Sequence, residues 1–143
     1  GFAHLDHVLR KRLYYPTPLC QLGQQLKRLA SSMIDVSDGL AQDLGHILKA
    51  SGVGARIQLD ALPISAALLQ LPEQKQWQYA LAGGDDYELC FTISAQNYQK
   101  LIQQKQDINI TKIGQITQHT DLTFVQNGVD HSLHFSGYQH FAE

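Results

Sequence analysis

Residues 34–40, Ile-Asp-Val-Ser-Asp-Gly-Leu, join an apolar run to a helix-like pattern. The apolar residues that lead into them predict a short strand over about 31–36. After Gly39, leucine and isoleucine recur at helical spacing, which predicts a helix over about 38–51 that Gly52 ends. The stretch therefore predicts a strand, a polar turn and a helix in direct succession.

The turn at this junction carries Asp35 and Asp38, with the hydroxyl of Ser37 between them. Two interpretations fit. In the first, the turn is a site for a divalent cation and a phosphate, because carboxylates bind hard cations and a helix start attracts phosphate. In the second, the turn is structural: Asp38 is the N-cap of the helix and Asp35 bonds locally. Spacing alone leaves both interpretations open.

A second acidic turn occupies residues 83–88, Gly-Gly-Asp-Asp-Tyr-Glu, and leads into an apolar strand over about 87–93. Carboxylates this close repel one another unless a cation or a ligand rich in hydrogen-bond donors lies near them. The alternative is a solvated turn between a helix and a strand. Two acidic turns with glycine in one chain favour the ligand-binding interpretation for both.

The rest of the pattern interleaves helices with strands and ends in a β-hairpin. Helices are expected over about 18–30, 65–69, 74–81 and 94–104, and strands over about 53–59, 108–116, 122–126 and 129–135. Ser65 and Ser94 are candidate N-caps. Asn127 and Gly128 are the strongest short-range hairpin signal available. We therefore expect an α+β fold, with a mixed β-sheet packed with helices.

The composition is that of one globular domain: 143 residues, 43% of them hydrophobic and 17% charged. The formal net charge of -2 gives no electrostatic reason to expect a nucleic acid or an anionic membrane as a partner. No apolar run approaches the roughly 20 residues that span a bilayer. Cys20 and Cys90 lie far apart without paired-ligand spacing, so we expect two small buried side chains in a reducing cytoplasm.

Other chemistry-bearing residues give weaker signals. The seven histidines include His131 and His134, but none has convincing metal-ligand spacing to a cysteine or an acid, so we expect surface or core histidines. The sequence holds no Walker lysine motif and no nucleophile elbow. The two acidic turns are therefore the best candidates for a functional site.

Three strings of this sequence resemble the C-terminal half of bacterial thiamine-monophosphate kinases. They are IDVSDGLAQDLGHILKASGVGARI at 34–57, ALAGGDDYELCFT at 80–92 and FSGYQHF at 135–141, in the same order along nearly the whole chain. The larger group resembles aminoimidazole ribonucleotide synthetase and includes selenophosphate synthetase and a hydrogenase maturation factor. The second and third strings favour the thiamine kinases within that group.

The resemblance implies ATP-dependent phosphorylation of thiamine monophosphate to thiamine diphosphate with several Mg²⁺ ions. Asp35 and Asp38 would hold Mg²⁺, and Ser37 would contact ATP. Asp85 would contact the substrate, at a position where many members have glutamate, and Tyr138 would line the thiamine pocket. Phosphoryl transfer depends on charge neutralisation and in-line positioning, so no protein nucleophile or base is expected.

Family members are much longer than this chain. The resemblance therefore implies that residues 1–143 are one domain, the C-terminal half of a two-domain kinase, with little activity alone. The N-terminal domain would add metal ligands, much of the nucleotide site and the interface of a homodimer. Two alternatives stand beside this one: another ATP-using member of the group, such as a selenophosphate synthetase-like enzyme, and a non-catalytic metal-binding or assembly domain.

Overall fold

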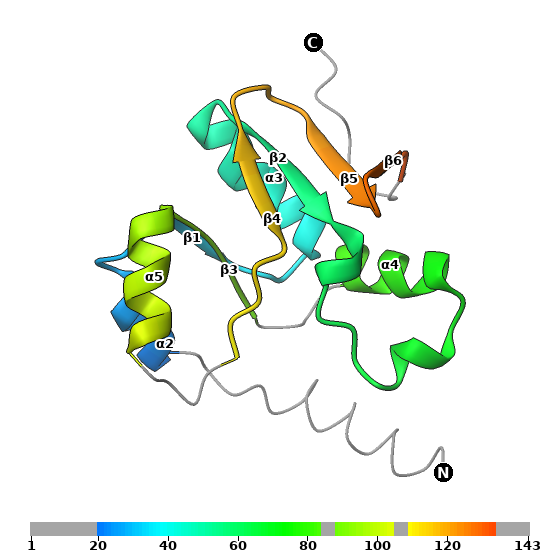
Figure 1. The fold of residues 1–143 in the computed structure, drawn as a ribbon, viewed down its shortest axis with the longest axis horizontal. Coiled ribbons are helices and arrows are strands. Elements are labelled where there is room, and N and C mark those ends of the chain that lie inside the picture. The colour runs from blue at the N-terminus through cyan, green and yellow to red at the C-terminus, as the bar shows by residue number, and fades with distance from the viewer. Residues whose placement is uncertain (1–19, 84–87, 105–108, 134–143) are drawn as a thin grey trace.

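The computed structural model describes residues 20–83, 88–104 and 109–133, which form helices and strands around two sheets (Figure 1). The helical elements are α2 (Cys20–Leu26), α3 (Leu40–Ser51), α4 (Glu73–Ala82) and α5 (Ala95–Gln103), with the 3-10 turns η1 (Leu59–Ala61) and η2 (Leu68–Gln70). The strands are β1 (Ala30–Asp35), β2 (Gly54–Gln58), β3 (Leu89–Ile93), β4 (Gly114–Thr117), β5 (Leu122–Gln126) and β6 (Val129–His131). The predicted α+β class is confirmed.

Within these residues the strands form a two-stranded sheet and a four-stranded sheet, where the sequence predicted one. β1 and β3 are antiparallel, with Asp35 opposite Leu89 and Ile34 opposite Cys90. The larger sheet has the order β4-β2-β5-β6, in which β2 and β5 are parallel and the other neighbours are antiparallel. The larger sheet is therefore mixed, as expected. The β1–β3 pair brings the end of β1 next to the start of β3, which follows the 83–88 turn.

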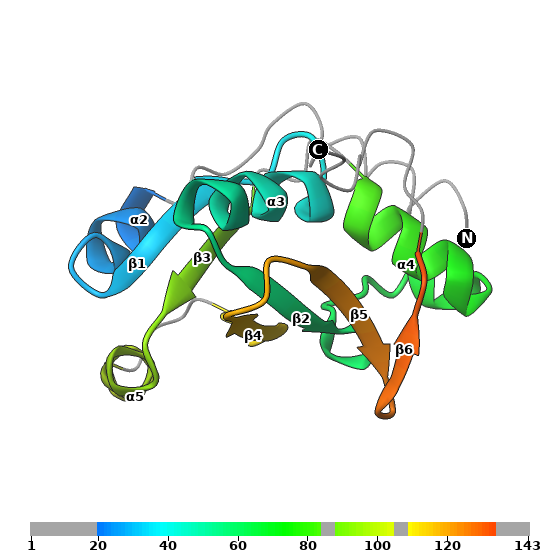
Figure 2. The ribbon, with the colours of Figure 1, turned by 90° about the horizontal axis from the view of Figure 1, so that it is seen from above.

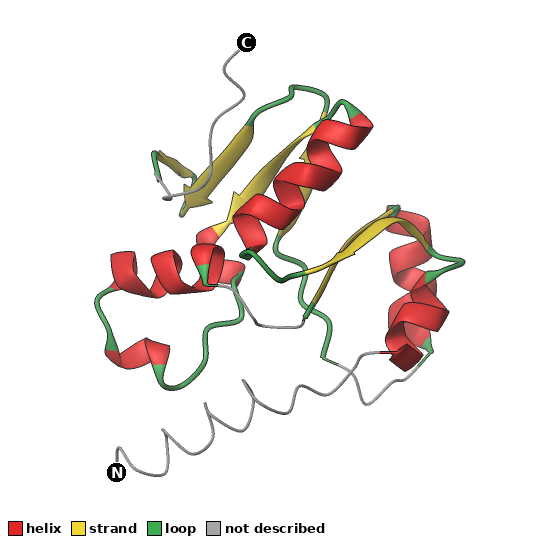
Figure 3. Cartoon of the chain, turned by 180° about the vertical axis from the view of Figure 1, so that it is seen from behind, coloured by secondary structure: helices red, strands yellow, loops and turns green. Residues whose placement is uncertain are grey.

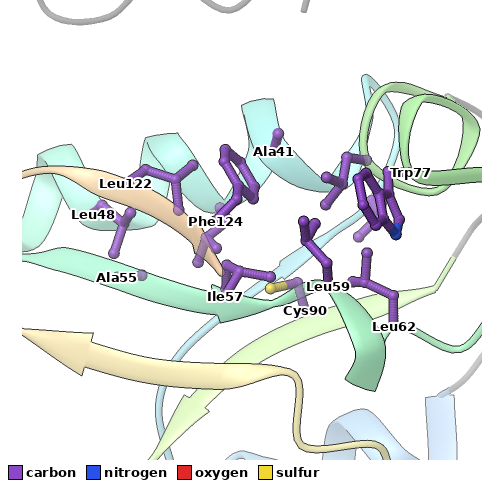
Figure 4. Close-up of a cluster of buried hydrophobic side chains, with 13 residues drawn as sticks. Ala41, Leu48, Ala55, Ile57, Leu59, Leu62, Trp77, Cys90, Leu122 and Phe124 are labelled. Atoms are coloured by element: carbon purple, nitrogen blue, oxygen red, sulfur yellow. The ribbon is translucent and has the colours of Figure 1, made fainter. Parts of the chain in front are cut away.

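One large cluster of buried side chains joins α3 and α4 to both sheets. Helix α3 lies across one face of the four-stranded sheet, and α4 lies on the same side near β6 (Figures 2 and 3). The side chains that fill the space between them are drawn in Figure 4: Val36, Ala41, Leu44, Leu48, Ala55, Ile57, Leu59, Leu62, Trp77, Leu81, Cys90, Leu122 and Phe124. Because each large apolar side chain contributes about 1.5–3 kcal/mol on burial, this cluster holds α3 firmly in place.

Helices α2 and α5 lie beside the β1–β3 pair (Figure 1), and a smaller apolar cluster joins them. Leu22 and Leu26 of α2 and Leu101 of α5 form its buried centre, and residues of β1 and β3 pack partly buried against it. The side-chain amide of Asn97 donates a hydrogen bond to the Leu29 carbonyl at 3.0 Å. The two short helices are thus tied to the strands that carry the acidic turns.

The elements with strong local signals are confirmed. Gly52 ends α3 in the left-handed conformation, with φ at 65°. The Ser94 hydroxyl accepts a hydrogen bond from the Asn97 N–H and caps α5. Asn127 and Gly128 both have positive φ in the turn between β5 and β6. These residues act through their own backbone geometry, which is why the sequence predicts them.

Four predicted elements differ. The helix expected over about 18–30 ends at Leu26, and Ala30 already belongs to β1. The strand expected over about 129–135 is assigned only as far as His131. The helix expected over about 65–69 is wrong, because the chain makes only the 3-10 turn η2, in which no side chain is buried. A short helix without a buried face lacks the packing that stabilises helices in proteins. The strand expected over about 108–116 is regular only from Gly114, where it pairs with β2.

Three further expectations concern side chains and the membrane. Cys90 is buried and free, as predicted, whereas the side chain of Cys20 lies outside the described part. His131 is half-buried, with its ring edge-on to Trp77 at 5.2 Å between ring centroids, which is a packing role. No helix among the described residues is long and apolar enough to cross a membrane.

Candidate functional site

Asp35 ends β1 with its side chain exposed, and it is the first residue of the segment 35–39, which we call the acidic loop. Side chains of a strand alternate between two faces. In β1, Ile34 packs against the large cluster, whereas Met33 and Asp35 are exposed. The core contact of Ile34 therefore places the Asp35 carboxylate on the solvent-exposed face of the β1–β3 pair.

The middle of the acidic loop presents Ser37 and Asp38 to solvent. Val36 is buried in the large cluster, and its N–H donates a hydrogen bond to the Glu88 carbonyl at 2.8 Å. Gly39 at the other end is buried as well, whereas Ser37 and Asp38 between them are exposed. Two buried anchors thus hold the loop, and its polar side chains point outward.

Gly39 occupies a position that other residues fill only with strain. Its φ is 110°, and a Cβ there would lie 3.0 Å from the Cα of Ala82 and 3.1 Å from the carbonyl oxygen of Leu81. Gly39 is the N-cap of α3, which has no side-chain cap. The predicted N-cap role of Asp38 is therefore wrong, because the close approach of α4 requires glycine at the cap. Among the described residues, the Asp38 carboxylate accepts only a long contact, 3.4 Å, from the side-chain amide of Gln42.

Asp43, which the sequence reasoning missed, holds the acidic loop from inside. It lies in the first turn of α3 and is 3% exposed. Its Oδ2 accepts hydrogen bonds from the N–H groups of Ser37, at 2.8 Å, and Asp38, at 3.0 Å. The signal in the sequence is a carboxylate beside Leu44 on the apolar side of a helix, where a buried charge is unfavourable without partners.

The described ends of the 83–88 turn lie against the acidic loop at the same end of the β1–β3 pair. Ala82, just before the 83–88 turn, lies against Gly39, and the Glu88 carbonyl accepts the N–H of the loop residue Val36. Both described ends of the second turn therefore flank the acidic loop.

Two predicted site residues cannot be compared with this geometry. Asp85 and Tyr138 lie outside the described residues, and their roles stay predictions. The side chains of Asp35, Ser37 and Asp38 are all exposed in the acidic loop, and their binding roles also stay predictions.

The acidic loop offers oxygen donors that suit a hard cation. Within the described ranges, neither Asp35 nor Asp38 has a cationic partner, and three metal-binding side chains nowhere gather closely enough to hold a metal ion by themselves. Mg²⁺ is usually bound by one or two carboxylates together with waters and substrate phosphates rather than by a complete protein cage. Two exposed carboxylates and the Ser37 hydroxyl fit a site of that kind.

Cys90 is unsuited to nucleophilic chemistry. It lies opposite Ile34 across the β1–β3 pair, and its side chain is buried. Burial, and to a smaller extent the negative charge of Asp43, raise the pKa of the Cys90 thiol to about 11. The thiol is therefore protonated at neutral pH, whereas nucleophilic cysteines react as thiolates.

Comparison with known proteins gives consistent matches. Residues 3–127 match the family described as AIR synthase related protein, C-terminal domain. The sequence is 44% identical over 140 residues to thiamine-monophosphate kinase of Salmonella typhimurium, covering 95% of this chain and 43% of that protein. The family match at residues 3–127 includes the acidic loop and the 83–88 turn but ends before Tyr138.

Two solved structures extend the comparison to the fold. Thiamine-monophosphate kinase from Stenotrophomonas maltophilia K279a is similar with a TM-score of 0.73 and 43% identity, over 85% of this chain and 39% of that one. AaThiL complexed with AMPPCP and TMP is similar with a TM-score of 0.69 and 26% identity, over 87% of this chain and 38% of that one. The chain thus spans less than half the length of these relatives.

Proposed function

The chain belongs to the family described as AIR synthase related protein, C-terminal domain, and from this premise we propose that it is the C-terminal half of a thiamine-monophosphate kinase. Such an enzyme uses ATP to phosphorylate thiamine monophosphate to thiamine diphosphate. The acidic loop is the observation that carries this proposal. It holds two exposed carboxylates and a hydroxyl together on a loop with buried anchors, within the segment that matches the family.

In this proposal Asp35 and Asp38 hold Mg²⁺, and the Ser37 hydroxyl contacts a phosphate oxygen of ATP. The metal neutralises the charge of two phosphate groups that have to approach each other. The chain itself supplies orientation. Because Val36 and Gly39 anchor the loop in the core, the two carboxylates are placed before any ligand binds, which lowers the cost of ordering them.

Asp85 and Tyr138 are proposed to contact thiamine monophosphate, Tyr138 by lining the thiamine pocket. This assignment rests on the strings at 80–92 and 135–141. An aromatic face attracts a cationic ring such as that of thiamine. The described ends of the 83–88 turn flank the acidic loop. In this proposal the substrate phosphate that accepts the phosphoryl group lies at that loop.

The reaction needs no protein nucleophile in this proposal. An oxygen of the substrate phosphate attacks the γ-phosphorus of ATP, the bond from that phosphorus to the β–γ bridging oxygen breaks, and ADP leaves. Catalysis then consists of positioning and charge stabilisation. The protonated thiol of Cys90 agrees with this scheme, since no covalent intermediate is required.

We also propose that residues 1–143 are one domain and that a preceding N-terminal domain completes the site. That domain would supply further metal ligands, much of the nucleotide site and the interface of a cytoplasmic homodimer. The extent of the match supports this view, because the chain covers 43% of the Salmonella typhimurium kinase. The 143-residue chain alone is then expected to have little or no kinase activity.

The test compares this chain with the complete polypeptide that the proposal implies, each assayed for thiamine diphosphate formed from ATP and thiamine monophosphate with Mg²⁺. The complete polypeptide is expected to form thiamine diphosphate, and the chain alone is not. ATP turnover with selenide instead of thiamine monophosphate would contradict the proposal in favour of a selenophosphate synthetase-like enzyme. No ATP turnover with any of these substrates would favour a metal-binding or assembly domain.

A further inference from the structure

Asp43 is the one charged side chain that is buried in the described part of the chain. A buried carboxylate is unfavourable unless hydrogen bonds compensate for the water it has lost. No cationic side chain among the described residues pairs with it. The compensation comes from backbone N–H groups of the acidic loop.

One oxygen of this carboxylate accepts two consecutive N–H groups. The distances from Oδ2 are 2.8 Å to the nitrogen of Ser37 and 3.0 Å to the nitrogen of Asp38. Hydrogen bonds to a charged acceptor are roughly twice as strong as those between neutral groups. The N–H of Asp43 also donates to the Gly39 carbonyl at 3.0 Å. Asp43 is thus bonded to three successive residues of the loop.

We propose that Asp43 is a positioning residue for the Mg²⁺–ATP site, which holds the acidic loop so that Ser37 and Asp38 turn their N–H groups inward and their side chains outward. The proposal rests on the function proposed above for this loop. Groups that orient metal ligands typically change metal affinity or activity by about 10–100-fold when they are removed.

The arrangement has a consequence for how the loop binds phosphate. Many helix starts and glycine-rich loops bind phosphate through backbone N–H groups. The N–H groups of Ser37 and Asp38 are occupied by Asp43 and are therefore not available to a ligand. Residues 37 and 38 consequently act through their side chains, whose directions depend on the loop conformation that Asp43 maintains.

Three variants separate positioning from helix stability. Asp43→Asn keeps the shape and one acceptor oxygen but removes the charge, and Asp43→Ala removes the acceptor altogether. Ala41→Gly is the matched control, since Ala41 is buried in the same first turn of α3 and glycine weakens a helix. The control leaves the carboxylate of Asp43 and its two hydrogen bonds in place.

The first measurement uses the 143-residue chain without metal and follows the backbone amides of Ser37 and Asp38 by NMR. In the wild-type chain both amides are expected to exchange slowly although their side chains are exposed. Asp43→Ala should speed up both by about tenfold or more, and Asp43→Asn by a smaller factor. Ala41→Gly should leave both chemical shifts unchanged. Rapid exchange of both amides in the wild-type chain would overturn the proposal.

The second measurement uses the complete polypeptide and determines the Mg²⁺ concentration that gives half-maximal thiamine diphosphate formation. Asp43→Ala is expected to raise this Mg²⁺ concentration by about 10–100-fold, with partial recovery of kcat at high Mg²⁺. For Asp43→Asn the value should lie between those of the wild type and Asp43→Ala. The KM for thiamine monophosphate should not change. Ala41→Gly should lower only the amount of active enzyme.

The outcomes distinguish this proposal from the one it rests on. An unchanged Mg²⁺ requirement in Asp43→Ala, or an equal rise in Ala41→Gly, would overturn the positioning role in an enzyme that is otherwise a thiamine-monophosphate kinase. A complete wild-type polypeptide that forms no thiamine diphosphate would contradict the proposed function itself, and the positioning role with it.

Discussion

Helices α3 and α5 begin in different ways. At α5, the Ser94 hydroxyl accepts the N–H of Asn97 at 3.2 Å, which is an ordinary N-cap. At α3, Gly39 stands at the cap, no side chain caps the helix, and Ser37 and Asp38 before it are exposed. The carboxylate at α3 comes from inside the helix and bonds to the loop rather than to the first N–H groups of the helix.

The difference separates a structural helix start from one that leaves the residues of the proposed site exposed. A side chain that caps a helix is held against the N–H groups of the helix and has fewer lone pairs left for a ligand. With glycine at the cap of α3, both carboxylates and the hydroxyl of the acidic loop stay exposed. Substitutions of the exposed side chains Asp35, Ser37 and Asp38 should therefore change activity more than stability, and substitution of the cap of α5 should do the reverse.

The largest effect is expected from Asp35→Asn and Asp38→Asn in the complete polypeptide. Each should lower kcat for thiamine diphosphate formation on the order of hundredfold, and by tenfold at the least. The reason is that a bound metal contributes several kcal/mol of charge stabilisation in the transition state. Both side chains are exposed, so the free energy of unfolding should change by less than about 0.5 kcal/mol. Steady-state kinetics and urea unfolding measure the two quantities.

Asp60→Asn is the control for these two variants, since Asp60 is an exposed carboxylate in η1, outside the acidic loop. It should leave both kcat and stability unchanged. If Asp35→Asn and Asp38→Asn are as active as this control, the two carboxylates of the acidic loop have no role in catalysis.

Gly39→Ala should produce the next largest effect, this time on stability. The positive φ and the contact with the backbone of Ala82 together should lower the free energy of unfolding by about 3 kcal/mol. Gly52→Ala is the control, because φ is also positive there but a Cβ would meet nothing within 4 Å. The control should lose about 1 kcal/mol in urea unfolding. Equal losses would show that the close approach of α4 does not constrain the cap of α3.

The pH dependence of stability tests the surroundings of the Cys90 thiol, which include the buried Asp43 of α3. The pKa of Cys90 is raised from 9.0 to about 11 by burial and then by Asp43. Since ionisation is harder in the folded state, the stabilisation is fully present below pH 9 and is lost as the pH rises toward 11. The wild-type chain should lose about 2 kcal/mol from this group between pH 8 and 10.5.

Urea unfolding at both pH values, under reducing conditions, measures that loss. Cys90→Ala should lack this part of the slope, and Asp43→Asn should reduce it, because one of the two causes is removed. Identical slopes in the wild type and in Cys90→Ala would show that the thiol is not held neutral by its surroundings.

Much of the fold followed from signals that act locally. Ser94, Gly52 and the pair Asn127–Gly128 each set the backbone around themselves, and the structure confirms all of them. The exposure of Asp35 has a local cause as well, since the two-residue period of a strand puts its side chain on the other face from that of Ile34. These features depend on neighbours in the chain and can be read without knowledge of the tertiary structure.

The errors at the site involve contacts that sequence patterns do not indicate. Aspartate is a good N-cap in general, so Asp38 was the reasonable local choice, but Ala82 approaches from another helix and leaves room only for glycine at position 39. Asp43 reaches back five and six residues to the loop, a contact that helical periodicity does not indicate. The division into two sheets is likewise decided by pairing between remote strands.

The smallest effects come from the two serines that precede these helices, and together they test the comparison most directly. Ser94→Ala removes the cap of α5 and should lower the free energy of unfolding by about 1 kcal/mol without changing kinase activity. The Ser37 hydroxyl has no hydrogen-bond partner among the described residues, so Ser37→Ala should change stability by less than about 0.5 kcal/mol. If the hydroxyl contacts ATP, the same variant should raise the KM for ATP by about 3–10-fold. If Ser37→Ala loses stability but keeps its KM for ATP, the Ser37 hydroxyl has a structural role like that of Ser94 and does not contact ATP.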